Sequence, residues 1–190
     1  MPSALDRHII ISGCSGGGKS SLLEVLRRRG EVVIDEPGRR IVCEELATDG
    51  SSLPWVNPAA FARRAILLSK QDRHAIETSS APVFFDRGLI DAAIALEHAT
   101  GEPVVHTLYG QLAFYRQVFF APPWPEIYQR DVQRQHVFDD AIEEYVRLTA
   151  AYPKLGYEIV LLPKTSADER ADFVQSTVSK SDNPLSSDKV

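Results

Sequence analysis

Short apolar runs alternate with longer amphipathic stretches along this chain. The apolar runs cover residues 8–12, 32–34, 82–86, 117–120 and 157–162 and have the length of buried strands. Stretches at residues 21–29, 59–78, 89–98, 139–152 and 167–174 are predicted to be helices. Strands that alternate with helices predict an α/β fold in which a parallel sheet is covered by helices on both faces.

Two segments show neither a helical nor a strand period. Residues 121–136 are rich in proline, arginine and glutamine, so we predict a mobile loop, or lid, that passes over the site. Residues 177–190 are rich in serine, aspartate and lysine and are predicted to form a disordered tail. Residues 1–176 are expected to form a single domain, because 190 residues with 44% hydrophobic content suit one compact core.

The amino-acid composition limits which binding partners and which cellular compartment are expected. The formal net charge of -5 gives no general attraction to nucleic-acid phosphates or anionic lipid, so we expect neither a nucleic-acid polymer nor a membrane as a partner. The two cysteines are too few for a disulfide framework, and no apolar stretch approaches the roughly 18 residues of a membrane span. These features predict a cytoplasmic protein and leave its oligomeric state open.

The turn after the first predicted strand carries the strongest chemical signal. It reads Gly-Cys-Ser-Gly-Gly-Gly-Lys-Ser over residues 13–20 and has the Gly-x-x-x-x-Gly-Lys-Ser/Thr spacing of a P-loop, or Walker A motif, between a strand and a helix. In such a loop backbone amides surround phosphates, Lys19 reaches the outer phosphates and the Ser20 hydroxyl coordinates magnesium. ATP and Mg²⁺ are therefore the expected cofactors, and the expected nucleotide-binding residues are Gly13, Ser15, Gly16, Gly17, Gly18, Lys19, Ser20 and Ser21.

Two acidic residues at the ends of predicted strands are candidates for the remaining chemistry. Asp86 closes an apolar strand and is placed either to hold the magnesium shell or to take a proton from an acceptor; its alternative role is to cap the following helix. Glu36 ends the second strand and is placed to act as a base or as a substrate anchor, because open α/β sheets bind ligands beyond the carboxyl ends of their strands. A surface salt bridge is the alternative for Glu36, and either acid remains a candidate for the base.

Three segments together resemble small-molecule P-loop kinases, in particular nucleoside and nucleoside-monophosphate kinases. They are the glycine-rich loop, Asp-Glu-Pro-Gly-Arg-Arg at residues 35–40 and Phe-Phe-Asp-Arg-Gly-Leu-Ile-Asp at residues 84–91. Tyr-Gln-Arg-Asp-Val-Gln-Arg at residues 128–134 and Tyr-Pro-Lys-Leu-Gly-Tyr-Glu-Ile-Val at residues 152–160 are similar to AAA-labelled ATPase and kinase domains related to the ribosylnicotinamide kinase domain. The resemblance extends over residues 8–174.

The resemblance implies a specific fold, site and activity. The fold is a three-layer P-loop NTPase fold with a five-stranded parallel sheet in the order 2-3-1-4-5. Glu36 or Asp86 is then the acid on the acceptor side, Arg87 contacts the acceptor or a phosphate, and Arg130 and Arg134 are the lid arginines. The expected function is transfer of the γ-phosphoryl group of ATP to a small acceptor of the nucleoside or nucleotide kind. The alternative is an ATPase or nucleotide-dependent switch that acts on a protein partner.

Overall fold

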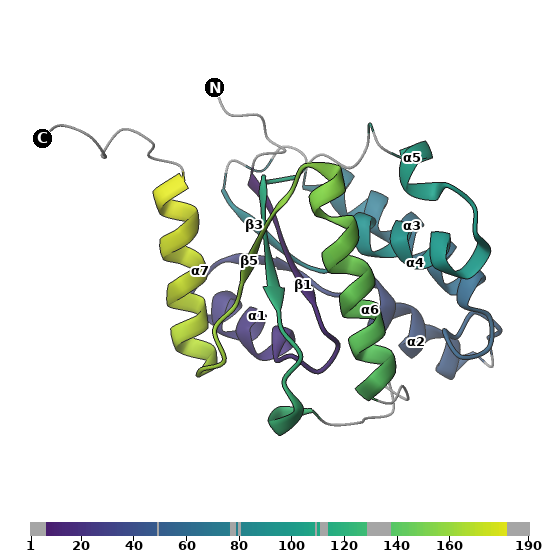
Figure 1. The fold of residues 1–190 in the computed structure, drawn as a ribbon, viewed down its shortest axis with the longest axis horizontal. Helices are drawn as coiled ribbons and strands as arrows, with labels where there is room; N and C mark the ends of the chain where they lie inside the picture. The colour runs from purple at the N-terminus through teal and green to yellow at the C-terminus, as the bar shows by residue number, and fades with distance from the viewer. Residues whose placement is uncertain are drawn as a thin grey trace, which may run out of the picture.

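A five-stranded parallel sheet between two layers of helices forms the fold (Figure 1). The computed structural model describes residues 7–48, 50–76, 79, 81–108, 110, 114–128 and 138–181. The strands are β1 (His8–Gly13), β2 (Val32–Ile34), β3 (Val83–Asp86), β4 (Gln117–Ala121) and β5 (Glu158–Leu161). The helices are α1 (Lys19–Arg28), α2 (Pro37–Ala47), α3 (Pro58–Ala75), α4 (Leu89–Thr100), α5 (Val104–Leu108), α6 (Phe138–Ala151) and α7 (Ala167–Ser181), with 3-10 turns η3 (Pro125–Ile127) and η4 (Pro153–Leu155).

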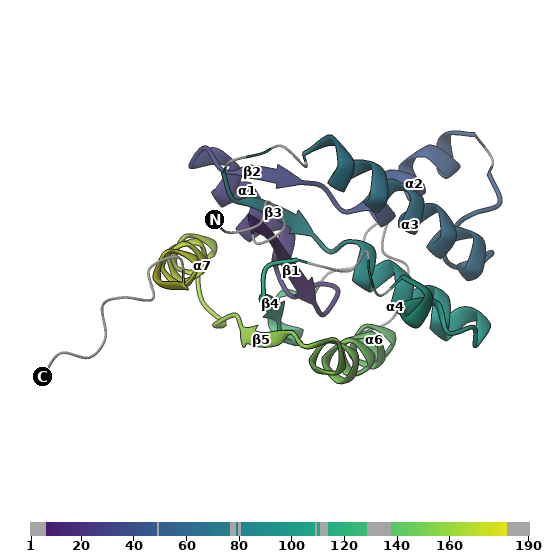
Figure 2. The same cartoon turned by 90° about the horizontal axis from the view of Figure 1, so that it is seen from above.

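The strand order is β2-β3-β1-β4-β5, which confirms the predicted order and fold class. Figure 2 shows the strands in this sequence from one edge of the sheet to the other. In the register of the central strands, Ile11 lies beside Asp86 of β3, and Gly13 lies beside Ala121 of β4. The carboxyl ends of β1, β3 and β4 therefore meet at one edge of the sheet, where the glycine-rich loop begins.

Successive side chains of β1 point to opposite faces of the sheet, and this divides the core into two clusters. Ile9 and Ile11 are buried with side chains of α1 and α7 on one face. Ile10 is buried on the other face with side chains of α4 and α6. Figure 2 shows these two helix pairs on opposite sides of the sheet. A run of β-branched residues buried on both faces is typical of a central parallel strand, so the sequence of β1 fixes the position of the loop that follows it.

The last helix is longer than the sequence pattern predicts. The predicted helix covers residues 167–174, whereas α7 continues to Ser181, and Val178 is 6% exposed within the core. Residues 177–181 are thus helical, and the prediction of a disordered tail from residue 177 is wrong for this part. Residues 182–190 lie outside the described residues. The predicted start of α7 is confirmed, because the Ser166 hydroxyl accepts a hydrogen bond from the Glu169 amide at 3.2 Å.

Two helices and part of the predicted lid also differ from the expectation. Helices α2 and α5 were not located by periodicity, since α5 is short and α2 follows directly on β2. In the predicted lid, Ala121 belongs to β4 and residues 125–127 form a 3-10 turn, whereas residues 129–137 lie outside the described residues. Among the helices that the structure describes, none combines the length and apolar character needed to cross a membrane.

Candidate active site

The glycine-rich loop between β1 and α1 is held by its own backbone and by β4. The Cys14 amide donates to the Ala121 carbonyl at 2.8 Å, and the Gly17 amide donates to the Cys14 carbonyl at 3.1 Å. Gly13 has a φ of +106°, and a Cβ there would lie 2.4 Å from the Ala121 carbonyl oxygen. Glycine is thus required at this position both by conformation and by the close approach of β4.

Lys19 lies inside the loop. Its side chain is buried, and Nζ donates to the carbonyl oxygens of Cys14 at 2.8 Å and of Gly13 at 3.4 Å. Burial, together with the charge of Arg87, lowers the pKa of Lys19 to about 8. A buried ammonium group among carbonyl oxygens is suited to bind an anion brought to the loop. Ser20 follows it in the first turn of α1, exposed at the surface.

Asp86 and Glu36 lie near Lys19 but differ in ionisation. Burial raises the pKa of Asp86 to about 7, and the negative charge of Glu36 adds to this effect. Burial also opposes ionisation of Glu36, but the charges of Arg87, Lys19 and Arg39 outweigh it and lower the Glu36 pKa. Glu36 is therefore a carboxylate at neutral pH, whereas burial favours the protonated form of Asp86. Both acids therefore lie close to the glycine-rich loop, as the sequence predicts.

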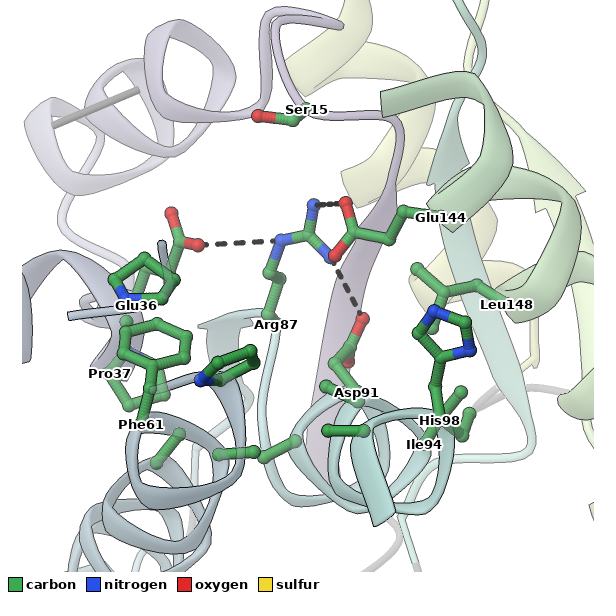
Figure 3. A pocket seen from close by; sticks show the side chains of 18 of the residues that line it. Ser15, Glu36, Pro37, Phe61, Arg87, Asp91, Ile94, His98, Glu144 and Leu148 are labelled. Carbon is green, nitrogen blue, oxygen red and sulfur yellow. Dashed lines mark hydrogen bonds and ion pairs between the residues drawn. The ribbon is translucent and has the colours of Figure 1, made fainter. Parts of the chain in front are cut away.

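Arg87 is the centre of an ion-pair network (Figure 3). Its guanidinium donates to both carboxylate oxygens of Glu144 at 3.0 and 2.9 Å and to the Gly13 carbonyl at 3.1 Å. Glu36 and Asp91 each lie 3.5 Å from it. The backbone at Arg87 has a φ of +60°, an unfavourable conformation for a residue with a side chain. The strained turn after β3 thus directs this guanidinium between three acids.

Asp91 joins this network to the core, and sequence reasoning assigned it no role. Its carboxylate accepts hydrogen bonds from the hydroxyl groups of Ser12 and, at 2.8 Å, of Tyr152. Burial raises the pKa of Asp91 against the charge of Arg87 and these hydrogen bonds. The sequence does contain one signal for the Arg87–Asp91 ion pair. The two residues are four positions apart at the start of a helix, and residues with this spacing can pair. No comparable signal pointed to Glu144, which reaches the site from α6.

A cavity of about 450 Å³ opens beside the loop, between α2, α3, α4 and α6. Ser15 and Glu36 lie at its polar end, while Phe61, Ile94 and Leu148 contribute apolar walls (Figure 3). This volume is within the range of pockets that bind small molecules, roughly 300–1,000 Å³. The site therefore combines a phosphate-type loop with an adjoining, largely apolar pocket that contains a carboxylate.

The other arginines considered from the sequence have different positions. Arg130 and Arg134 lie outside the described residues. Arg39 pairs with Glu36 at 3.2 Å, and Arg40 pairs with Asp72 of α3 at 2.7 Å.

The residues of the loop and of β3 fit ATP with a magnesium ion. A buried oxygen of Asp86, Oδ1, has no hydrogen-bond partner among the described residues and is available to a water molecule of a metal shell. Positive φ angles at Gly16 (+80°) and Gly18 (+77°) produce the turn of the loop that leads into α1. Ser20 and Asp86 would hold the metal, and the loop amides with Lys19 would hold the phosphates.

Comparisons with known proteins show the family of the chain and agree with its fold. The family model described as an AAA domain matches residues 8–170. A deoxyadenosine kinase from M. mycoides, whose structure contains the products dCMP and a flexible dCDP, superposes with a TM-score of 0.61 at 13% identity, over 91% of this chain and 99% of that chain. Shikimate kinase from Acinetobacter baumannii, in complex with shikimate, superposes with a TM-score of 0.57 at 15% identity, over 92% and 94%. At these identities the similarity shows only that the chain shares a fold with these two kinases. No curated protein sequence matches the chain.

Proposed function

The chain belongs to the AAA domain family, and from this and the site geometry we propose that it is an ATP-dependent kinase that phosphorylates a hydroxyl group of a small molecule. One observation carries the proposal. The 450 Å³ pocket adjoins the glycine-rich loop and contains both Ser15 of that loop and the carboxylate of Glu36. An ATPase or a switch that acts on a protein partner has no need of a small-molecule pocket at this position, so the pocket favours a kinase.

Each residue of the site has a proposed part in this reaction. The loop amides and Lys19 would bind and orient the triphosphate of ATP, which supplies the phosphoryl group. Bound Mg²⁺ would neutralise negative charge on the triphosphate. Ser20 and Asp86 belong to the metal shell. Glu36 lines the pocket and is ionised at neutral pH, so it accepts a hydrogen bond from the acceptor hydroxyl, aligns its oxygen and receives its proton. Arg87 keeps Glu36 in place through their ion pair.

The charges of the pocket favour an acceptor without a negative charge. Four lining residues are carboxylates and three are guanidiniums, namely Glu36, Asp91, Asp140 and Glu144 against Arg39, Arg87 and Arg147. Each of these guanidiniums has an acidic partner: Arg39 has Glu36, Arg87 has Glu144, and Arg147 has Glu143. A phosphate or carboxylate on the acceptor would have to compete with these partners. We therefore expect a nucleoside rather than a nucleoside monophosphate.

A panel of paired acceptors tests this function. Purified protein is incubated with γ-labelled ATP, Mg²⁺ and either a nucleoside, its 5′-monophosphate, nicotinamide riboside or shikimate, and labelled products are separated. We expect label on nucleosides and on the cationic riboside, at rates at least roughly tenfold above those on the anionic compounds, since like charges in a partly buried site repel strongly. Preferential labelling of monophosphates or shikimate would contradict the charge argument. Label found only as inorganic phosphate would favour the ATPase alternative.

A further inference from the structure

Arg170 is a charged residue at a core position of α7. Its side chain is 2% exposed and lies on the same helical stripe as Ala171, Val174 and Val178, which are all buried. Burying a charge has a large free-energy cost unless polar partners replace the lost water. The contacts of Arg170 must therefore provide that compensation.

The Arg170 side chain contacts two consecutive carbonyl groups of the glycine-rich loop. The Arg170 guanidinium donates from Nη2 to the Gly17 carbonyl at 3.0 Å and from Nη1 to the Gly18 carbonyl at 3.2 Å. Its carbon Cζ lies 5.8 Å from the centre of the Trp124 ring. Within the described part of the chain, Arg170 has no carboxylate partner, and its Nε has no hydrogen-bond partner. The cation is thus compensated mainly by the loop backbone.

The loop is shaped to receive this guanidinium. Gly18 has a φ of +77°, and a Cβ at this position would lie 2.6 Å from Nη1 of Arg170. A side chain at residue 18 would therefore displace the arginine as well as strain the backbone. Gly18 has two structural functions here, to form the left-handed turn before α1 and to admit Arg170.

The two carbonyls determine the direction of two amides. Because a peptide unit is planar and trans, the N–H of the next residue points opposite to the carbonyl. Fixing the carbonyls of Gly17 and Gly18 on Arg170 consequently directs the N–H groups of Gly18 and Lys19 away from Arg170. A nearby cation on the carbonyl side also polarises each amide and strengthens its N–H as a donor. Both effects favour binding of an anion on the opposite side of the loop.

We propose that Arg170 is a positioning residue of the phosphate-binding loop, which acts through the carbonyls of Gly17 and Gly18 to hold the amides of Gly18 and Lys19 toward the triphosphate. The proposal rests on the proposed function only in that it assumes ATP as the ligand of the loop. It assigns α7, which lies far from the glycine-rich loop in the sequence, an influence on nucleotide affinity.

Two substitutions and a matched control test the proposal. Arg170→Met removes the guanidinium and keeps an unbranched side chain, whereas Arg170→Lys keeps the charge but not the two-pronged donor. Arg29→Met is the control, because Arg29 joins α1 to α7 through Asp172 and Gln175 without touching the loop. We measure Mg-ATP affinity by titration calorimetry, thermal stability, and the amide NMR chemical shifts of Gly18 and Lys19 without nucleotide.

We expect Arg170→Met to bind Mg-ATP roughly tenfold or more weakly, Arg170→Lys to lie between it and wild type, and both to shift the resonances of the two loop amides, because the amides lose their fixed direction and their polarising cation. Arg29→Met should lose thermal stability and keep wild-type affinity and wild-type resonances at these amides. Wild-type affinity in Arg170→Met, or an affinity loss in Arg29→Met as large as in Arg170→Met, would overturn the proposal. If wild type itself does not bind ATP, the proposed function fails, and unchanged resonances of the two amides in Arg170→Met would still overturn the role of Arg170.

Discussion

At the scale of single residues, the site depends on which charges are compensated. Arg87 is surrounded by Glu144, Glu36 and Asp91, and these acids raise its pKa against the effect of burial. It therefore stays charged and acts as a fixed link between the helices around the pocket. The resemblance to P-loop kinases implied that Arg87 contacts the acceptor or a phosphate, but it did not indicate these acidic partners. Its acidic partners depend on tertiary contacts, which a linear pattern of residues does not contain.

The buried carboxyl group of Asp91 gives a prediction on pH. Its pKa is raised in the folded protein, so the folded state binds this proton more tightly than the unfolded state, where the group titrates at about pH 3.9. Its contribution to stability is present below that pH and is lost as the pH rises through the folded pKa. We expect the free energy of unfolding of wild type, relative to Asp91→Asn, to decrease from pH 4 upward.

Urea denaturation of both proteins at several pH values between 4 and 7.5 measures this difference. Asparagine preserves the shape of the side chain and can still accept a hydrogen bond from Ser12 or Tyr152, so both proteins should fold. A difference in unfolding free energy that is constant over this range, or that increases with pH, would show that burial does not dominate the titration of Asp91.

At the scale of elements, alternating strands and helices were predictable because each strand carries a concentrated apolar signal. The limits of β2 were predicted to the residue, and the other strands to within one residue at each end. Helix α7 was predicted too short, since Thr177, Ser179 and Lys180 conceal the single apolar residue Val178 among polar neighbours. Arg170 was missed for a related reason. A charged residue on an apolar stripe is evident in the sequence, but its partner, the loop backbone, is 152 residues away.

The position of Val178 in the core gives a prediction for α7. Its side chain is 6% exposed and packs in the cluster that includes α1. Val178→Ala removes two methyl groups from this cluster and should reduce the free energy of unfolding by about 2 kcal/mol. The matched control is Val146→Ala on α6, where the valine is 57% exposed, and its effect should be small. Equal effects in chemical denaturation would indicate that the end of α7 does not pack on the core in solution.

At the scale of the whole molecule, the sheet brings two half-sites together at one edge. In the proposed kinase, the loop after β1 and the acid at the end of β3 would hold the nucleotide. Glu36 and helices α2, α3, α4 and α6, which enclose the pocket, would hold the acceptor. The fold and the loop were predictable from the sequence. The pocket was not, because its walls come from four helices whose relative positions are set by packing. Phosphoryl transfer by the proposed kinase therefore requires that both half-sites act in one reaction.

The distribution of the γ-phosphoryl group between acceptor and water tests this requirement most directly. It is measured with labelled ATP and the best acceptor of the panel, in wild type, Glu36→Gln and Asp86→Asn. We predict that wild type labels the acceptor. Glu36→Gln should still bind Mg-ATP and retain the slow background hydrolysis of ATP, but transfer to the acceptor should fall by roughly 100-fold or more. Asp86→Asn should lose both transfer and hydrolysis and should require a higher magnesium concentration. Transfer that is intact in Glu36→Gln, or unaffected by either substitution, would contradict the account.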